Sequence, residues 1–300
     1  MEASQATLAA PQTAGGWRTV VADYVALTKP KVQALLLLTT VCTMEVAGDP
    51  SIGLIALTVA GGYLSAGGAG AVNHWYDRDI DALMERTANR PVPAGRVSPR
   101  AALVYGVVLA LLSFVLLAAT VNLLAAALAF SGFLGYVFVY TVWLKRRTPQ
   151  NIVIGGAAGA VPPLVGWAAV TGELAGMPIY LFAIVFFWTP PHFWALSLLM
   201  KDEYARVGIP MLPVVRGEAE TRRQITRYTV LLVASTLIPA LGGLLGWVYA
   251  VLAVVLGAAF LGMAVFLERR PTRRGALRLY LFSLAYLALL FGAMVVDASL

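Results

Sequence analysis

The chain has 300 residues, of which 60% are hydrophobic and only 12% charged, whereas a soluble domain is nearer half apolar and about a quarter charged. This composition excludes an ordinary soluble domain and indicates a polytopic membrane protein. Despite the formal net charge of +7, no segment resembles a nucleic-acid-binding module, so we expect no nucleic-acid partner. The single cysteine, Cys42, excludes an intrachain disulfide and a cysteine-based zinc site.

Apolar runs long enough to cross a hydrocarbon core as helices follow one another along the chain. They lie near residues 30–48, 51–76, 99–118, 122–144, 150–170, 177–200, 228–246, 248–267 and 277–296. The sequence therefore predicts an all-α protein with nine transmembrane helices. Residues 1–28 resemble neither a signal peptide nor a transit peptide, so we expect a short N-terminal cytoplasmic tail before one transmembrane domain at 29–300.

The basic residues indicate how these helices are oriented. All 22 lysines and arginines precede the first span or follow the second, fourth, sixth or eighth, so they share one side of the membrane. By the positive-inside rule this side is the cytoplasm. We therefore expect a cytoplasmic N-terminus and, after nine crossings, a C-terminus outside.

The second predicted span is rich in glycine and ends in a polar stretch, residues 73–81. Glycines such as Gly68 allow neighbouring helices to approach closely. Asn73, Asp77 and Asp81 recur every four residues, so on a helix their side chains share one face. Mg²⁺ takes one or two carboxylates and keeps waters and substrate phosphates as its other ligands. This stripe predicts a magnesium ion shared with a diphosphate, the alternative being acids that are merely solvated at the membrane interface.

Basic residues accompany this stripe in the sequence. Arg86 and Arg90 lie in the loop after it, and arginine recognises phosphate oxygens with a planar, always-charged fork. Lys29 stands at the start of the first span, and Lys145 and Arg146 close the fourth. Each of these residues either faces an anionic ligand or anchors its helix at the interface.

The sixth predicted span repeats the order of the second: acidic residues at its end, then arginine, then prolines. Four spans separate the two sites, so both acidic ends meet the same interface. This favours a parallel pseudo-repeat of two four-helix units plus a ninth helix, with two acidic clusters facing one cavity. The residues singled out here are His192, Trp194, Lys201, Asp202, Glu203 and Arg206.

Three stretches, Asn73–Pro93, Tyr140–Gly166 and Trp188–Val215, closely resemble the protohaem IX farnesyltransferases (haem O synthases). These belong to the intramembrane aromatic prenyltransferases typified by the 4-hydroxybenzoate polyprenyltransferases. The resemblance implies nine transmembrane helices around a central cavity and Mg²⁺ bound by two aspartate-rich motifs. It also implies transfer of farnesyl from farnesyl diphosphate to a vinyl group of haem B, with water addition, to give haem O for terminal oxidases.

The resemblance assigns roles to single residues. Asn73, Asp77 and Asp81 match the first motif, whereas the second is reduced, because Leu198 stands where the wider superfamily has another aspartate. Either Asp202 or Glu203 could therefore reach a metal. The expected catalytic residues are Asp77, Asp81, Arg86, Arg90 and Lys29; the substrate-binding residues are Asn73, Lys145, Arg146, His192, Trp194, Lys201 and Arg206; the Mg²⁺ ligands are Asn73, Asp77, Asp81, Asp202 and Glu203.

Several expectations about setting and partners accompany these roles. The only histidines, His74 and His192, are each open to a haem-ligating or a structural role. We expect a multi-pass protein of a bacterial or archaeal plasma membrane, with its site on the cytoplasmic side. The expected partners are farnesyl diphosphate, haem B as a substrate, the lipid bilayer, a haem A synthase or oxidase-assembly protein, and further copies of the chain. The alternatives are a prenyltransferase acting on a quinone precursor and a transporter, whose ionisable groups would lie near the bilayer midplane.

Overall fold

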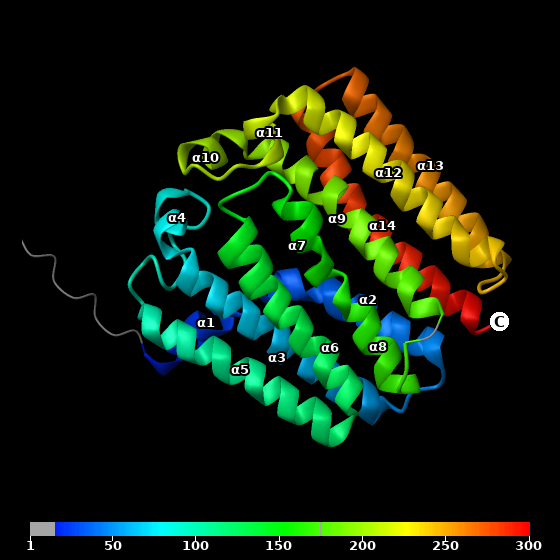
Figure 1. Ribbon diagram of the computed structural model, residues 1–300, viewed down its shortest axis with the longest axis horizontal. Coiled ribbons are helices and arrows are strands. Elements are labelled where there is room, and N and C mark those ends of the chain that lie inside the picture. Colours follow the sequence, from blue (N-terminus) through cyan, green and yellow to red (C-terminus); the bar gives the residue numbers. More distant parts are fainter. Residues whose placement is uncertain (1–15, 175) are drawn as a thin grey trace, which may run out of the picture.

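The computed structural model describes residues 16–174 and 176–300 (Figure 1). Within these residues it contains helices and turns but no β-strand, which confirms the all-α class. The elements are α1 (Trp17–Leu27), α2 (Pro30–Ala47), α3 (Ile52–Tyr76), α4 (Arg78–Leu83), α5 (Pro99–Thr120), α6 (Leu123–Leu134), the π-helix η1 (Gly135–Leu144), α7 (Asn151–Gly159), α8 (Val161–Thr171), α9 (Met177–Leu199), α10 (Lys201–Arg206), α11 (Leu212–Val215), α12 (Gly217–Leu241), α13 (Trp247–Arg269) and α14 (Arg273–Ala298).

The described part of the chain holds 8 helical units long and apolar enough to cross a membrane, or 9 if the bent pair α1 and α2 forms one span. These two helices meet at an angle of 53°. The bend has a local cause, because Pro30 disfavours the right-handed α conformation at the residue before it. Lys29 has a φ of 55°, the left-handed region that non-glycine residues rarely occupy, so neither helix continues through it. Most of the predicted tail lies outside the described residues, and its last part forms α1.

The seventh predicted span began too late. We placed its start at residue 228, whereas α12 begins at Gly217. The added turns are polar, so hydropathy did not mark them, but they are stabilised by pairs four residues apart on one helical face. Arg222 is paired with Glu218, and Gln224 donates a hydrogen bond to Glu220.

Two other spans depart from a regular α-helix. The fourth combines α6 with η1, and the N–H of Lys145 donates to the carbonyl of Tyr140, five residues earlier. The fifth is broken at Ala160, where Pro162 and Pro163 open α8. The π-helix had no counterpart in our sequence-based prediction. The predicted pseudo-repeat and central cavity stay predictions.

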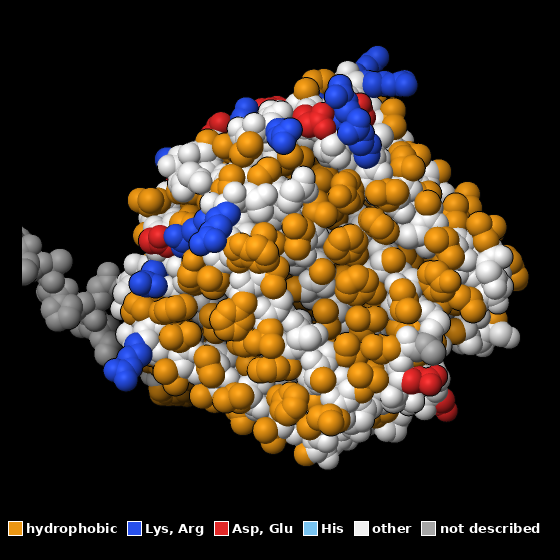
Figure 2. Space-filling view, viewed as in Figure 1, with side chains coloured by type: hydrophobic (Ala, Val, Ile, Leu, Met, Phe, Trp, Pro, Cys, Tyr) orange, Lys and Arg blue, Asp and Glu red, His pale blue; other side chains and the backbone are white. Residues whose placement is uncertain are grey.

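Helices from distant parts of the chain form the bundle. α3 packs against α5, α6 and η1, while α9 packs against α12, α14 and α7, and α2 packs against α8 and α14. Figure 2 shows apolar side chains over the middle of one face, with Lys and Arg side chains gathered along the edge where Figure 1 places α4, α10 and the turn between α13 and α14. The one-sided placement of basic residues is therefore visible in the fold.

Helices α3 and α5 approach closely at two glycines. A Cβ atom on Gly68 would lie 2.6 Å from the carbonyl oxygen of Gly106, and one on Gly106 would lie 2.7 Å from the carbonyl oxygen of Gly68. Both neighbours are backbone atoms, which cannot rotate away as a side chain can. The small residues predicted to permit close packing do so here.

We expect Gly68→Ala to destabilise the protein by about 1 to 3 kcal/mol, because α3 and α5 must separate to accept the methyl group. Gly262→Ala is the matched control, since Gly262 lies inside α13 and a Cβ there would have no neighbour within 4 Å. Thermal unfolding of both variants in one detergent measures the difference. Equal unfolding temperatures for the two would show that the contact is not restrictive.

Candidate functional site

The predicted stripe of Asn73, Asp77 and Asp81 spans the junction of two helices and keeps its four-residue spacing there. α3 ends at Tyr76, and Asp77 is both its C-cap and the residue before α4. The N–H of Asp77 nevertheless donates to the carbonyl of Asn73 at 2.9 Å, and the N–H of Asp81 donates to the carbonyl of Asp77 at 2.8 Å. The four-residue spacing is therefore helical throughout. Asn73, Asp77 and Asp81 are 3%, 0% and 3% exposed, which argues against acids merely solvated at the interface.

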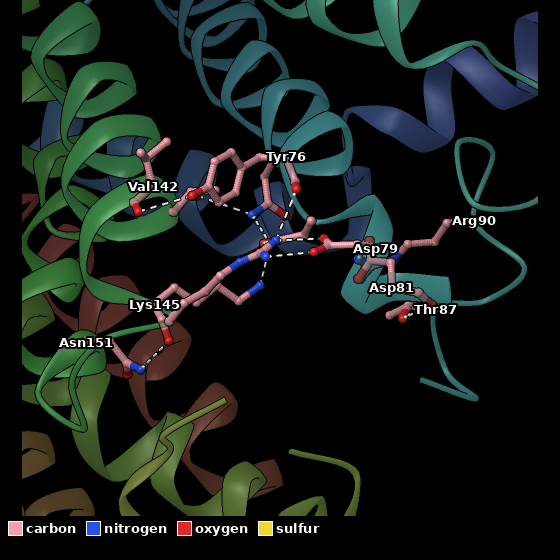
Figure 3. A network of polar contacts seen from close by, with 12 residues as sticks. Tyr76, Asp79, Asp81, Thr87, Arg90, Val142, Lys145 and Asn151 are labelled. Atoms are coloured by element: carbon pink, nitrogen blue, oxygen red, sulfur yellow. Dashed lines mark hydrogen bonds and ion pairs between the residues drawn. The ribbon is translucent and has the colours of Figure 1, made fainter. Parts of the chain in front are cut away.

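Residues from η1 and the following turn neutralise the buried Asp77 carboxylate. The Lys145 ammonium donates to Oδ2 of Asp77, and Nη2 of Arg146 lies 3.3 Å from its Oδ1. The Asn73 amide donates to Oδ2 at 2.7 Å. A carboxylate removed from water is strongly destabilised unless it is paired and hydrogen-bonded in this way. Ion pairs with the Asp77 carboxylate therefore link the end of the fourth span to the end of the second (Figure 3).

Arg146 also contacts the next acid along the chain. Its guanidinium contacts both carboxylate oxygens of Asp79, each at 2.8 Å, and donates to the carbonyl of Tyr76 at 3.1 Å. The same guanidinium stacks over the Tyr76 ring at 4.8 Å. The hydrogen bonds from Arg146 lower the pKa of the Asp79 carboxyl. Arg146 therefore holds the first turn of α4 against the end of η1.

Two further cations complete the cluster. Nη1 of Arg90 lies 2.6 Å from Oδ2 of Asp81, and Thr87 of the same loop donates to the carbonyl of Asp81 at 2.8 Å. The Lys29 ammonium donates to Oδ1 of Asn73 at 2.5 Å, from the bend between α1 and α2. We name this group, Asn73, Asp77, Asp79 and Asp81 with Lys29, Arg90, Lys145 and Arg146, the carboxylate cluster. Its cations outnumber its carboxylates, so it can attract an anion.

Sequence reasoning missed three polar residues that support the cluster. Thr141 accepts a hydrogen bond from the Asn73 amide at 3.2 Å. The Asn151 side chain, fully buried, donates to the carbonyl of Lys145 at 3.2 Å. The Tyr76 hydroxyl donates to the carbonyl of Val142 at 3.3 Å. The available signal was a polar residue at the end of an apolar run, which does not show its contacts until the helices are packed.

The segment after α9 folds over the loop after α4. Tyr204 of α10 is buried in one hydrophobic cluster with Ile80 and Met84. Nη1 of Arg206 lies 3.8 Å from Oε1 of Glu85, and both side chains are largely exposed. Burial raises the pKa of the Tyr204 phenol, and the positive charge of Arg86 opposes this rise. Arg206 thus reaches the loop after α4, and Arg86 of that loop lies near the Tyr204 phenol.

The two acids of the reduced motif differ in their surroundings. Oε2 of Glu203 is buried and has no hydrogen-bond partner among the described residues. Asp202 is exposed and lines a cavity of about 250 Å³ with residues of α12 and of the turn before α14, none of which belongs to the carboxylate cluster. Of the pair, Glu203 is therefore the acid with an unused buried oxygen.

Three predicted substrate-binding residues contact other parts of the bundle. Nδ1 of His192 is hydrogen-bonded to the Ser283 hydroxyl of α14 at 2.7 Å, and its ring stacks on Trp188 at 4.4 Å. Trp194 is buried with its edge against Tyr228 of α12. Lys201 pairs with Glu218 at 3.0 Å. A structural role for His192, the alternative to haem ligation, predicts contacts of this kind. His74 differs, because it is buried and neither ring nitrogen has a partner in the described chain.

The donor set of the cluster suits a hard cation only if other ligands are added. In the described residues, no group of three or more His, Cys, Asp or Glu side chains is arranged to hold a metal ion. Asp77 and Asp81 supply carboxylate oxygens, and Asn73 supplies an amide oxygen. Mg²⁺ is commonly bound by one or two carboxylates with waters and substrate phosphates. These residues therefore fit a magnesium ion that arrives with an anionic substrate.

We expect Lys145→Met to destabilise the protein by about 3 kcal/mol, because the buried Asp77 carboxylate loses its ammonium partner. Combining it with Asp77→Asn should cost less than the two single changes added, since the charges depend on one another. Lys31→Met, which removes an exposed lysine of α2, is the matched control. Unfolding in detergent measures all four variants. Strict additivity would mean that Lys145 and Asp77 are not energetically coupled.

Comparison with known proteins identifies the family. A sequence model of the UbiA prenyltransferase family matches residues 34–290. A Symbiobacterium thermophilum relative named protoheme IX farnesyltransferase is 54% identical over 284 residues, covering 93% of this chain and 95% of the relative. A Chloroflexus aurantiacus relative of the same name is 55% identical over 94% of this chain. The chain spans only 48% of that relative, so about half the length of some relatives has no counterpart here.

A solved structure shows the same fold. A UbiA homologue from Archaeoglobus fulgidus, described as bound to DMAPP and Mg²⁺, superposes with a TM-score of 0.69 at 18% identity and covers 91% of this chain and 99% of that chain. At this identity the likeness is evidence of fold alone. The sequence relatives confirm the resemblance noted from the motifs. The chain therefore belongs to the UbiA prenyltransferase family of multi-pass membrane proteins, in which it groups with relatives named protoheme IX farnesyltransferase.

Proposed function

We propose that the chain transfers a farnesyl group from farnesyl diphosphate to a vinyl group of haem B, giving haem O and diphosphate. One observation carries the proposal. It is the buried stripe of Asn73, Asp77 and Asp81, which meets cations from three other segments of the chain. The names of the sequence relatives support the choice of substrates. The Archaeoglobus fulgidus structure is described as bound to DMAPP and Mg²⁺, which supports the choice of a prenyl diphosphate as donor.

The reaction divides between charge stabilisation and carbon chemistry. The bond between C1 of farnesyl and its oxygen breaks, and the electron pair leaves with diphosphate. A vinyl carbon of haem B attacks C1, and water then adds to the cation on the porphyrin side with loss of a proton. We propose that Arg86, Arg90, Lys29, Lys145 and Arg146 stabilise the charge that develops on the leaving diphosphate, an electrostatic effect greatest in the transition state.

We propose that Asp77, Asp81 and Asn73 hold Mg²⁺, and that Glu203 holds a second Mg²⁺ in preference to Asp202. Magnesium bound there would neutralise phosphate oxygens and so make diphosphate a better leaving group. The support for Glu203 is its buried, unpartnered oxygen.

The remaining predicted substrate-binding residues lie further from the stripe. Arg206, linked to Glu85 across the loops, would cover the substrate site at its rim. We propose that His192, Trp194 and Lys201 support the substrate site by packing the bundle around it, since their side chains contact α12 and α14.

Two alternative functions would need a different acceptor or a different placement of the ionisable groups. A prenyltransferase acting on a quinone precursor would use the same cluster with another acceptor. A transporter would need ionisable groups near the middle of the spans. The carboxylate cluster instead lies where α3 ends, on the edge that carries the basic side chains. A haem A synthase or oxidase-assembly protein as partner, and self-association, remain expectations from the resemblance alone.

We propose that the site faces the cytoplasm, with the N-terminus inside and the C-terminus outside in a bacterial or archaeal plasma membrane. The support is the gathering of Lys and Arg side chains at one edge of the bundle (Figure 2).

We expect Asp77→Asn or Asp81→Asn to lower Mg²⁺-dependent haem O formation by roughly 100- to 1,000-fold while the protein stays folded, because the leaving diphosphate loses its electrostatic support. Asp49→Asn is the matched control, since it removes the same charge from an exposed position between α2 and α3, outside the carboxylate cluster. Incubation with haem B, farnesyl diphosphate and Mg²⁺, followed by mass analysis of the porphyrin, measures product. Full turnover by the Asp77 variant would refute the assigned role, and a prenylated quinone precursor with untouched haem would select the first alternative.

Topology is testable with C-terminal fusions. We expect alkaline phosphatase fused after Leu300 to be active and green fluorescent protein at the same point to be dark, because an odd number of crossings places this end outside the cytoplasm. An inactive phosphatase and a bright green fluorescent protein would place the C-terminus in the cytoplasm, on the same side as the N-terminus. The number of crossings would then be even, and α1 and α2 would not form a span.

A further inference from the structure

Two adjoining cavities lie at the basic end of the bundle, between the end of α9 and the turn that joins α13 to α14. The larger, of about 370 Å³, is lined by Leu199, Arg273, Arg274 and Leu277. The smaller, of about 250 Å³, shares Leu199 and Arg273 with it and extends along the start of α12.

The charges around these cavities leave two arginines available. Lys201 and Arg222 are both paired with Glu218, at 3.0 Å and 3.5 Å, and Asp202 adds a second carboxylate to the smaller cavity, so these four side chains carry no net charge. Arg273 and Arg274 take part in none of the ion pairs formed within the described residues. Both are exposed, and they supply guanidinium donors that suit a phosphate.

The cavities are separate from the carboxylate cluster. α14 packs against α9, α13 and α2, whereas the cluster is built on α3, α4 and the end of η1. In Figure 1 the turn between α13 and α14 and the helix α4 stand at different corners of the bundle. None of the four residues around the larger cavity was expected to bind substrate or metal.

Apolar side chains form the other wall of the larger cavity. Leu277 lies one turn into α14 and is 45% exposed, on a helix apolar enough to span a membrane. A ligand that placed a phosphate beside Arg273 and Arg274 would therefore meet hydrocarbon-compatible surface on its other side. Free phosphate would use the arginines but gain nothing from the two leucines.

We propose that these cavities bind the headgroup of an anionic phospholipid, with its phosphate on Arg273 and Arg274 and the start of its acyl chains against Leu199 and Leu277. The two arginines begin the candidate membrane span Arg273–Ala298, and basic groups at the end of a spanning helix recognise anionic lipid headgroups. The proposal concerns a lipid bound beside the enzyme site and does not depend on which prenyl acceptor that site takes.

Native mass spectrometry of the full-length protein in detergent tests this with phosphatidylglycerol and phosphatidylcholine of identical acyl chains. We expect the wild type to prefer phosphatidylglycerol. Arg273→Gln with Arg274→Gln should weaken that binding by about 30-fold, since the phosphate would lose its charge-assisted hydrogen bonds to two guanidinium groups. Arg269→Gln with Arg270→Gln is the matched control, because it removes the same charge from the end of α13 without touching the cavities. This control should change binding by less than about threefold.

Two further arms identify the ligand and guard against misfolding. Millimolar inorganic phosphate should not displace the lipid, and Leu277→Asn should weaken phosphatidylglycerol binding while leaving both arginines in place. The conservative pair Arg273→Lys with Arg274→Lys keeps both charges and should retain most of the preference, which separates loss of charge from loss of structure. Equal losses in the cavity and control variants would overturn the proposal in favour of general charge attraction. Displacement by phosphate would overturn it in favour of a site for the free anion.

Discussion

The arrangement of this protein's site depends on the burial of one carboxylate, that of Asp77. Because the side chain is fully buried, its charge must be paired inside the protein, and the partners Lys145 and Arg146 come from another part of the chain. This requirement ties the end of α3 to the end of η1. The π-helix matters here, because the lysine that meets Asp77 follows directly at its C-terminus.

The other charges of the cluster extend this logic outward. Asp81 is paired with Arg90 from the following loop, and Asn73 is contacted by Lys29 from the bend before α2. The two cations come from different connections, so the loops are held over the helix ends by the same contacts that gather positive charge at the cluster. The strained φ of Lys29 fits this picture, since backbone strain persists where surrounding contacts over-determine it.

Substrate chemistry and membrane placement impose compatible demands on the fold. A diphosphate leaving group requires cations and hard oxygen ligands, while a hydrophobic prenyl chain requires apolar surroundings. Locating the polar cluster where helices leave the apolar band satisfies both, because the charged group need not cross the bilayer centre. The second basic region, at Arg273 and Arg274, also places charge beside apolar surface. It lies at another corner of the bundle, where two leucines adjoin the two arginines.

Hydropathy, charge spacing and the four-residue recurrence of Asn73, Asp77 and Asp81 were enough to predict a helical membrane protein, the positions of most spans and the burial-prone stripe that forms the candidate site. These properties are local, so they are written in consecutive residues. The sequence did not indicate that η1 is a π-helix, that α12 begins at Gly217, or that Thr141 and Asn151 support the cluster. Nor did it separate Glu203 from Asp202, or place His192 against Ser283. Those outcomes depend on which helices pack together, because pairing and burial are properties of contacts between segments far apart in the chain.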